Sequence, residues 1–117
     1  MSQCLFIRNK REFYKIAFAD IIYIESWKNY VRVVTAENKF MIKTTITSME
    51  ELLPKQDFCR IHRGYIVSLQ SITGFNHRYV HLAGKDLPIS QQYRRVLLAS
   101  VITLEDKRQI ATASLKH

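Results

Sequence analysis

The chain has 117 residues, 47% of them hydrophobic and 24% charged, a composition typical of one soluble globular domain and too short for two ordinary domains. No apolar run approaches the roughly 18 residues of a membrane span, and residues 1–10 lack the order of a signal peptide, so we expect a cytoplasmic protein. Lysine and arginine number 18 against 10 aspartates and glutamates, a net charge of +8. This excess suits a polyanionic partner, either nucleic acid or an acidic membrane surface, unless it only keeps the protein soluble.

Short β-strands are predicted for most of the chain, because apolar and polar residues alternate and β-branched and aromatic residues are frequent. Only 3 glycines and 2 prolines occur, so we expect a single domain over residues 1–117 without a linker. The glycine spacing matches the turn spacing of a β-meander. The predicted strands are, in chain order, Cys4–Arg8, Phe13–Ala17, Ile21–Glu25, Tyr30–Thr35, Lys39–Lys43, Phe58–Arg63, Tyr65–Val67, Ile72–Phe75, Tyr79–Leu82 and Leu87–Ile89.

A short central helix is predicted where the strand pattern first breaks. Residues Thr47–Glu50 read as a capping box, in which the threonine hydroxyl accepts a hydrogen bond from the backbone of the glutamate and the glutamate reaches back. Met49, Leu52 and Leu53 then share one helical face, and Pro54 ends the helix.

A C-terminal helix is predicted to begin after Ser90, a residue type that caps helix N-termini well. The polar tail, residues 105–117, either frays or extends this helix. The apolar positions at helical spacing are Tyr93, Val96, Leu97 and Val101.

The predicted strand Phe58–Arg63 is basic. Period-two alternation places Cys59 and Ile61 together on the inward face. Arg60 and His62 then share the outward face, where they could meet an anionic partner. The cations between residues 58 and 103 are Arg60, Arg63, Arg78, Lys85, Arg94 and Arg95, against the single anion Asp86.

The sequence lacks the features of an enzyme. Three glycines cannot build a glycine-rich phosphate loop. The adjacent carboxylates Glu50 and Glu51 are expected to be solvated on the helix surface. Cys59 and His62 stand three apart, which points them to opposite faces of a strand. We therefore expect no catalytic residues and no enzymatic activity.

Metal and cofactor sites are also not expected. Zinc needs four closely spaced ligands, and Cys4, His77 and His81 supply no such pattern. The two histidines are best explained as surface residues. Cys4 and Cys59 fit two buried reduced thiols better than one disulfide, although a single bridge is open from the sequence.

Three segments carry the residue types that contact nucleic acid. Phosphate contacts need Lys, Arg, backbone N–H groups and hydroxyls, and base reading needs Arg, Asn, Gln or Lys at exposed turns. The first segment joins two strands, the second runs into a turn, and the third opens a helix whose N-terminal amides favour phosphate. These segments are Trp27–Tyr30, Arg60–Arg63 and Ser90–Arg95.

In order and content, several segments resemble the LytTR family, the DNA-binding output domain of many bacterial response regulators. They cover about residues 6–101 and include the F-x-R-I-H-R and L-P-I-S patterns. The resemblance implies a mainly β, elongated fold of small antiparallel β-sheets with one short central helix, to which the sequence adds the C-terminal helix. The matching segments are Ala19–Ser26, Asn29–Val31, Thr47–Leu53, Phe58–Val67 and Leu87–Ser90.

The resemblance also implies contact loops inserted into successive major grooves of double-stranded DNA. Two positions depart from the family pattern: Gly64 stands where serine is common, and Gln91 stands where arginine is common. Glutamine suits adenine, whereas arginine suits guanine. The candidate DNA-binding residues are Lys28, Asn29, Tyr30, Arg60, His62, Arg63, Gln91, Gln92 and Arg94.

The predicted function is therefore sequence-specific binding of double-stranded DNA by a bacterial transcriptional regulator, as in a two-component system. Implied partners are promoter half-sites, including direct repeats, a receiver domain or sensor-linked partner, and a second copy on DNA. The chain is too short to include a receiver domain, so it is either a stand-alone regulator or an excised effector domain.

Two alternatives remain open from the sequence. One is a single-strand or RNA-binding β module that stacks bases on Tyr30, Tyr65 and Phe75. The other is a protein-interaction module whose basic face docks on an acidic partner. For Tyr30 a packed strand aromatic and a DNA contact are equally good interpretations, and Trp27 is expected to pack rather than to stack on bases.

Overall fold

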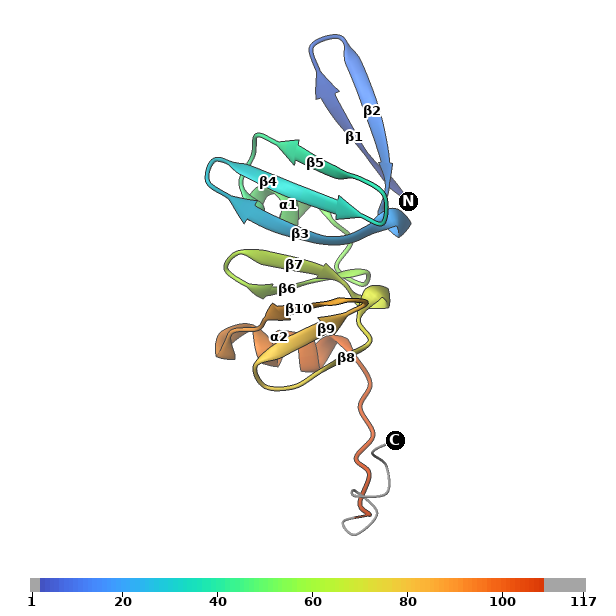
Figure 1. Cartoon of the computed structure of the whole chain (residues 1–117), viewed down its shortest axis with the longest axis vertical. Coiled ribbons are helices and arrows are strands. Elements are labelled where there is room, and N and C mark those ends of the chain that lie inside the picture. Colours follow the sequence, from blue (N-terminus) through green and yellow to red (C-terminus); the bar gives the residue numbers. More distant parts are fainter. Residues whose placement is uncertain (1–2, 109–117) are drawn as a thin grey trace.

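The computed structural model describes residues 3–108 and shows an elongated molecule, with principal-axis extents of 61 × 27 × 26 Å. Most strands run across the long axis, and three sheets follow one another along it (Figure 1). The predicted mainly β, elongated fold of small antiparallel sheets is confirmed.

The described residues form ten β-strands, two α-helices and two short 3-10 helices, η1 and η2. The strands are β1 (Cys4–Asn9), β2 (Glu12–Ala17), β3 (Ile21–Trp27), β4 (Tyr30–Thr35), β5 (Lys39–Ile42), β6 (Phe58–His62), β7 (Tyr65–Ser68), β8 (Gly74–Phe75), β9 (Tyr79–Leu82) and β10 (Lys85–Pro88). The helices are η1 (Phe18–Asp20), α1 (Ile46–Leu52), η2 (Leu69–Ser71) and α2 (Gln91–Ser100).

All strand pairs are antiparallel. The β1–β2 hairpin stands apart at one end of the molecule, the central sheet has the order β5-β4-β3-β7-β6, and the third sheet has the order β10-β9-β8 (Figure 1). The predicted strands all form, with small shifts at their ends. The strand predicted for residues 72–75 starts only at Gly74, because the 3-10 helix Leu69–Ser71 precedes it.

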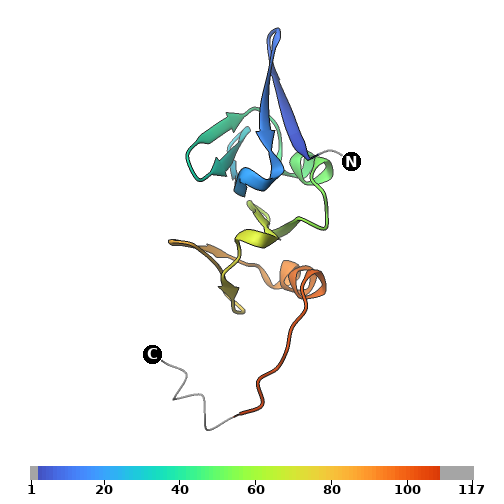
Figure 2. The same cartoon turned by 90° about the vertical axis from the view of Figure 1, so that its right-hand side faces the viewer.

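The central sheet is buried on both faces, which explains why its strands are so rich in β-branched residues. Alternate residues along each strand enter two separate hydrophobic clusters. The first cluster lies under α1 and the β1–β2 hairpin and includes Ile24, Val33, Phe58 and Ile66. The second lies against α2 and the third sheet and includes Tyr23, Val34, Ile61 and Val67. Figure 2 shows the two helices on the same side of the molecule.

Burial on both faces overturns the prediction for the strand at residues 58–63. Cys59 and Ile61 face the second cluster, as expected. The opposite face is not solvent-exposed, because Phe58 belongs to the first cluster and Arg60 is only 9% exposed. The expectation that Arg60 faces outward is therefore wrong.

The start of α1 also differs from the prediction. The N-cap is Thr45, whose hydroxyl accepts a hydrogen bond from the Ser48 amide at 3.0 Å, and Thr47 lies inside the helix. Glu50 does not reach back, because its carboxylate binds Arg60 instead. Leu52 is 63% exposed and so does not share the buried face of Met49.

Helix α2 begins after Ser90, as predicted, but the Ser90 side chain makes no capping bond. Leu97 is fully buried against the second cluster, whereas Val96 is half exposed. The chain leaves the helix at Val101, and residues 102–108 form no helix or strand. Of the predicted polar tail, residues 109–117 lie outside the described part of the chain.

Candidate nucleic-acid interface

The three segments predicted to contact DNA lie at one end of the strands, on the same side of the molecule (Figure 1). Two backbone hydrogen bonds connect them in a row. The Ser26 amide, at the end of β3, donates to the Gly64 carbonyl in the β6–β7 turn at 2.9 Å. The Ser90 amide, before α2, donates to the Ile61 carbonyl of β6 at 3.0 Å. Segments far apart in sequence thereby form one continuous edge.

The first segment is a two-residue hairpin turn between Trp27 and Tyr30, which are paired in register. Lys28 has a φ of 58°, in the left-handed region, and this conformation projects Lys28 and Asn29 from the sheet, where both are exposed. Tyr30 is 41% exposed and is therefore accessible to a ligand.

Trp27 frames this turn rather than entering the core. It is 49% exposed, so the expectation that it packs is only partly correct. The Arg32 guanidinium lies over its ring at 4.9 Å and also pairs with Glu25 at 2.9 Å. Arg32 is therefore occupied, and Lys28 is the free cation of the turn.

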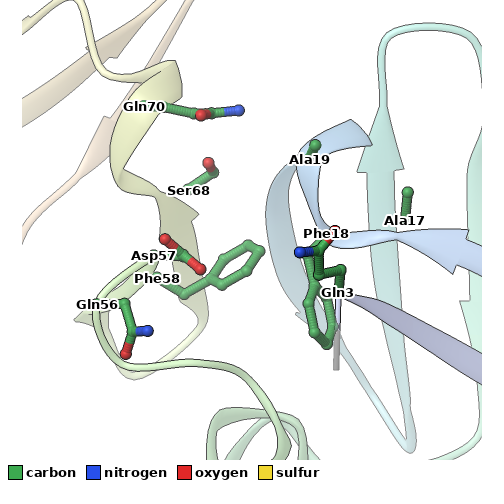
Figure 3. A pocket seen from close by; sticks show the side chains of 9 residues that line it. All are labelled: Gln3, Ala17, Phe18, Ala19, Gln56, Asp57, Phe58, Ser68 and Gln70. Atoms are coloured by element: carbon green, nitrogen blue, oxygen red, sulfur yellow. The ribbon is translucent and has the colours of Figure 1, made fainter. Parts of the chain in front are cut away.

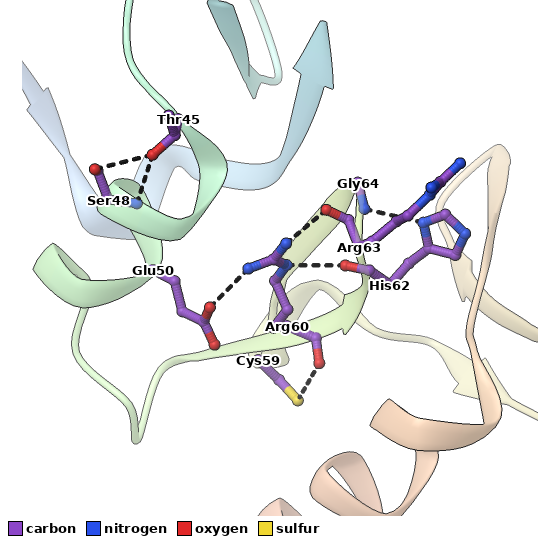
Figure 4. A network of polar contacts seen from close by, with 8 residues as sticks. All are labelled: Thr45, Ser48, Glu50, Cys59, Arg60, His62, Arg63 and Gly64. Atoms are coloured by element: carbon purple, nitrogen blue, oxygen red, sulfur yellow. Dashed lines mark hydrogen bonds and ion pairs between the residues drawn. The ribbon is translucent and has the colours of Figure 1, made fainter.

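The second segment, the β6–β7 turn at Arg63 and Gly64, is held by Arg60 (Figure 4). The Arg60 guanidinium donates to the His62 carbonyl at 2.9 Å and to the Arg63 carbonyl at 2.6 Å. It also pairs with the Glu50 carboxylate of α1 at 2.7 Å, so the prediction that Glu50 is simply solvated is wrong. Arg63 itself is exposed, and its side chain points away from Glu50 (Figure 4).

His62 supports the same turn from its other side. Its Nδ1 accepts a hydrogen bond from the Gly64 amide at 3.0 Å (Figure 4), so neutral His62 carries its proton on Nε2. Burial lowers the pKa of the imidazole, and the positive charges of Arg63 and Arg60 lower it further. His62 is thus an uncharged hydrogen-bond donor at neutral pH. Its ring packs against the Tyr65 ring, with the two ring centroids 5.6 Å apart.

The third segment is the first turn of α2. Gln91 and Gln92 are exposed there, as the first two residues of a ten-residue helix. Arg94 is half-buried, and its guanidinium donates to the His77 carbonyl of the β8–β9 turn. Gln91 and Gln92 are therefore free to meet a ligand, while Arg94 is partly engaged within the protein.

Two basic residues at this end were not among the predicted DNA-binding residues. Lys43 follows β5, whose Ile42 pairs with Val31, and therefore lies beside the start of β4. Arg78 lies in the β8–β9 turn, whose carbonyl accepts from the Ile89 amide at 3.0 Å. Both are exposed. Arg78 was counted in the basic cluster, but only strand register could show that it reaches this edge.

The aromatic residues of the single-strand alternative do not form a common platform. The Tyr65 hydroxyl donates to the Glu25 carboxylate at 3.2 Å, and burial followed by the Glu25 charge raises the Tyr65 pKa. Phe75 packs against the second hydrophobic cluster. Of the three aromatics, Tyr30 alone is exposed.

A hollow of about 420 Å³ lies at the other end of the strands, between η1 and the start of β6 (Figure 3). Phe18 and Phe58 meet edge to face beneath it, with ring centroids 6.0 Å apart. Its only charged lining residue is Asp57. An acidic hollow does not attract nucleic acid, so the basic edge is the candidate interface.

The remaining features of residues 3–108 concern metal ligands, apolar helices and cysteines. This part of the chain contains no group of three or more His, Cys, Asp and Glu side chains arranged to hold a metal ion. None of its helices combines the length and the apolar character needed to cross a membrane. Cys4 and Cys59 are both free thiols, and Cys4 is only partly buried. Burial raises the pKa of the Cys59 thiol.

Basic turns and a helix N-terminus along one edge of an elongated β-protein are features of the nucleic-acid-binding class of domains. Comparison with known families makes this specific. Residues 11–101 match the family described as the LytTr DNA-binding domain, and the chain belongs to this family. The resemblance seen in the sequence is thereby confirmed.

Relatives agree with this assignment. The sensory transduction protein LytT of Bacillus subtilis is 31% identical over 84 residues, which are 67% of this chain and 35% of that protein. The CO-responsive transcriptional regulator RcoM of Rhodospirillum rubrum is 35% identical over 60 residues, 51% of this chain and 25% of that protein. The chain thus spans about a third or less of the curated relatives described here.

A solved structure shows the same fold. The LytTr DNA-binding domain of a putative methyl-accepting/DNA response regulator from Bacillus cereus superposes with a TM-score of 0.71 at 22% identity. The match covers 86% of this chain and 97% of that one.

Proposed function

We propose that this chain binds double-stranded DNA sequence-specifically, as the output domain of a bacterial transcriptional regulator in a two-component system. The observation that carries the proposal is the row of three segments joined by the Ser26–Gly64 and Ile61–Ser90 backbone hydrogen bonds. A duplex lying along the molecule's long axis would meet all three, and residues 6–101 would act as one DNA-binding unit.

The exposed side chains divide into two roles. Lys28 and Arg63 supply charge for phosphates or for guanine, and Asn29 can read an adenine edge. Gln91 stands where an arginine is common in the family, so we expect an adenine-directed contact there, with Gln92 beside it able to make the same kind of contact. The amides at the start of α2 favour a phosphate. Tyr30 and the His62 Nε2–H complete the surface as neutral hydrogen-bond donors.

Arg60 has a different role in this proposal. Its guanidinium is used inside the protein, on two carbonyls and one carboxylate. We therefore assign it to positioning of the β6–β7 turn rather than to DNA contact. Arg94 is mixed, since one of its nitrogens holds the β8–β9 turn.

The proposal includes the protein's partners and location. We propose a cytoplasmic DNA-binding module rather than an enzyme, one that works with a receiver domain or a sensor-linked partner. We also propose that two copies pair on repeated half-sites, as the family resemblance seen in the sequence implies.

Selection of bound duplexes from a random library tests the proposal. We expect one recurring motif, and tighter binding to that duplex than to its separated strands. Arg63→Ala should then weaken binding, lowering the salt slope by about 0.9 if Arg63 holds a phosphate, or costing about 1–3 kcal/mol at one base pair if it reads a base.

Lys39→Ala is the matched control, because it also removes one exposed positive charge, from the other end of the central sheet. Lack of any enriched motif, or equal loss in both variants, would contradict the proposal.

A further inference from the structure

We propose that the β8–β9 turn, residues 76–78, is a fourth DNA-contacting segment, in which Arg78 binds a phosphate of the duplex backbone. The inference rests on the proposed function and extends its surface beyond the three segments implied by the family. It assigns a role to the turn that sequence reasoning left unassigned.

The turn continues the row of contact segments. The Arg78 carbonyl accepts from the Ile89 amide at 3.0 Å, one residue before the Ser90 amide that bonds to Ile61. The His77 carbonyl accepts from the Arg94 guanidinium of α2. Two bonds therefore fasten this turn to the helix start, just as one bond fastens the helix start to β6.

The turn is rigid as well as close. The Asn76 side-chain oxygen accepts from the amides of Arg78 and Tyr79, both at 2.8 Å. The Asn76 amide in turn donates to the Tyr79 carbonyl at 2.9 Å. A backbone held in this way loses little conformational entropy on binding, so a contact made by the turn carries only a small free-energy cost of ordering.

The side chains around the β8–β9 turn carry an excess of positive charge, which favours binding of an anion. Arg78 and Arg95 are exposed, and Arg94 is bonded to the carbonyl of His77, the neighbour of Arg78. Residues 76–78 and 90–95 contain no carboxylate. Asp86 is the one acidic residue of the third sheet, and its carboxylate is paired with the His81 imidazole at 2.7 Å. It stands two residues before Pro88, the end of β10 at this edge. Within residues 3–108, the Arg78 side chain makes no hydrogen bond or ion pair.

The division of labour between two arginines follows from these contacts. Arg94 was the residue predicted from the sequence to bind DNA, but one of its guanidinium nitrogens donates to the His77 carbonyl and holds the turn in place. Arg78, which it positions, projects from the turn with its guanidinium unused. Guanidinium is well suited to phosphate because it presents several donors in a plane. A phosphate contact would position the duplex without reading its sequence.

The test measures binding to the selected duplex and to a scrambled duplex as a function of salt. We expect Arg78→Ala to reduce the steepness of log K against log salt by about 0.9, one phosphate contact, and to weaken both duplexes by the same factor. Arg78→Lys should keep the slope. Lys39→Ala, which makes the same change in net charge at the other end of the sheet, should leave it unchanged.

A second measurement locates the contact on the DNA. Duplexes in which single phosphates are replaced by neutral methylphosphonates are compared for wild-type and Arg78→Ala protein. We expect one position at which neutralisation weakens the wild type but has no further effect on the variant.

The outcomes separate the two proposals. If the wild-type protein binds the duplex and Arg78→Ala has the same salt slope as the wild type, this inference is overturned and the proposed function stands. The same holds if Lys39→Ala lowers the salt slope as much as Arg78→Ala does. Loss of discrimination between the selected and scrambled duplexes in Arg78→Ala would also overturn the phosphate assignment. A wild-type protein that binds no duplex overturns both.

Discussion

Arg60 acts through the protein rather than on DNA, and this makes a testable difference. Its guanidinium joins α1, through Glu50, to the carbonyls of His62 and Arg63. Arg60→Met leaves both carbonyls without their donor and should lower the free energy of unfolding by about 1.5–3 kcal/mol. Because the turn then loses its fixed position, affinity for the selected duplex should fall, as measured by fluorescence anisotropy.

The salt slope distinguishes positioning from contact. A residue that positions the turn changes affinity without removing a phosphate contact, so the slope should stay as in the wild type. Arg60→Lys keeps the charge but not the fork of donors, and should recover only part of the affinity. A slope lowered by about 0.9 in Arg60→Met would show instead that Arg60 touches a phosphate directly.

His62 predicts how stability depends on pH. Its pKa is lowered by burial, by Arg63 and by Arg60, so as pH falls below the ordinary histidine value of about 6.5 the unfolded chain takes up the proton first. The free energy of unfolding should therefore decrease from about pH 6.5 downward, until folded His62 also protonates. Protonated Nδ1 can no longer accept from the Gly64 amide.

Urea titrations at a series of pH values measure this effect. His62→Gln should flatten the decline, whereas His77→Gln, at an exposed turn position, should retain it. An identical decline in the wild type and in His62→Gln would assign the pH dependence to other groups.

At the residue scale, the sequence could predict several of the exposed residues that line the edge, but not Lys43 or Arg78, and not which of the basic residues are free of contacts within the protein. Lys28, Arg63 and Gln91 were recognisable because they stand at turns or at a helix start. Arg60 was misjudged because period-two alternation assumes one solvated face, and β6 has none. The partner that makes its burial tolerable, Glu50, is ten residues away, on α1.

At the scale of elements, local signals placed nearly every strand, because alternation and turn residues act over a few positions. The start of α1 was less determined. Thr45 and Thr47 are both good capping residues, and the glutamate at position 50 favoured Thr47 by the capping-box pattern. In the structure Glu50 is paired with Arg60, which is distant in sequence, and Thr45 is the cap.

Alanine substitution at the two threonines should show which one caps the helix. Thr45→Ala removes the acceptor of the Ser48 amide and should cost about 1 kcal/mol of stability. Thr47→Ala, at an exposed position inside the helix, should change stability by less than about 0.5 kcal/mol. Chemical denaturation measures both. A larger loss in Thr47→Ala would restore the original prediction.

At the scale of the whole molecule, the sheet order was not readable from local pattern, since it depends on pairings such as β3 with β7 across some forty residues. The order of motifs along the chain did carry the overall shape, through the family resemblance. The arrangement has a clear physical consequence. Each of the two hydrophobic clusters is built on one face of the same central sheet. Unfolding of the sheet would therefore expose the apolar residues of both clusters to water at once.

This shared sheet predicts a single cooperative unfolding transition in spite of the elongated shape. Ile66 and Ile61 are a matched pair, because each side chain is at most 1% exposed. Ile66 belongs to the first cluster and Ile61 to the second. Each change to alanine should cost about 2–5 kcal/mol and move the whole transition. Fluorescence of Trp27, the sole tryptophan, and hydrogen exchange at Val33 and Val80 should report the same free energy of unfolding. A transition that splits in Ile61→Ala, with Val80 opening before Val33, would mean that the two clusters fold independently.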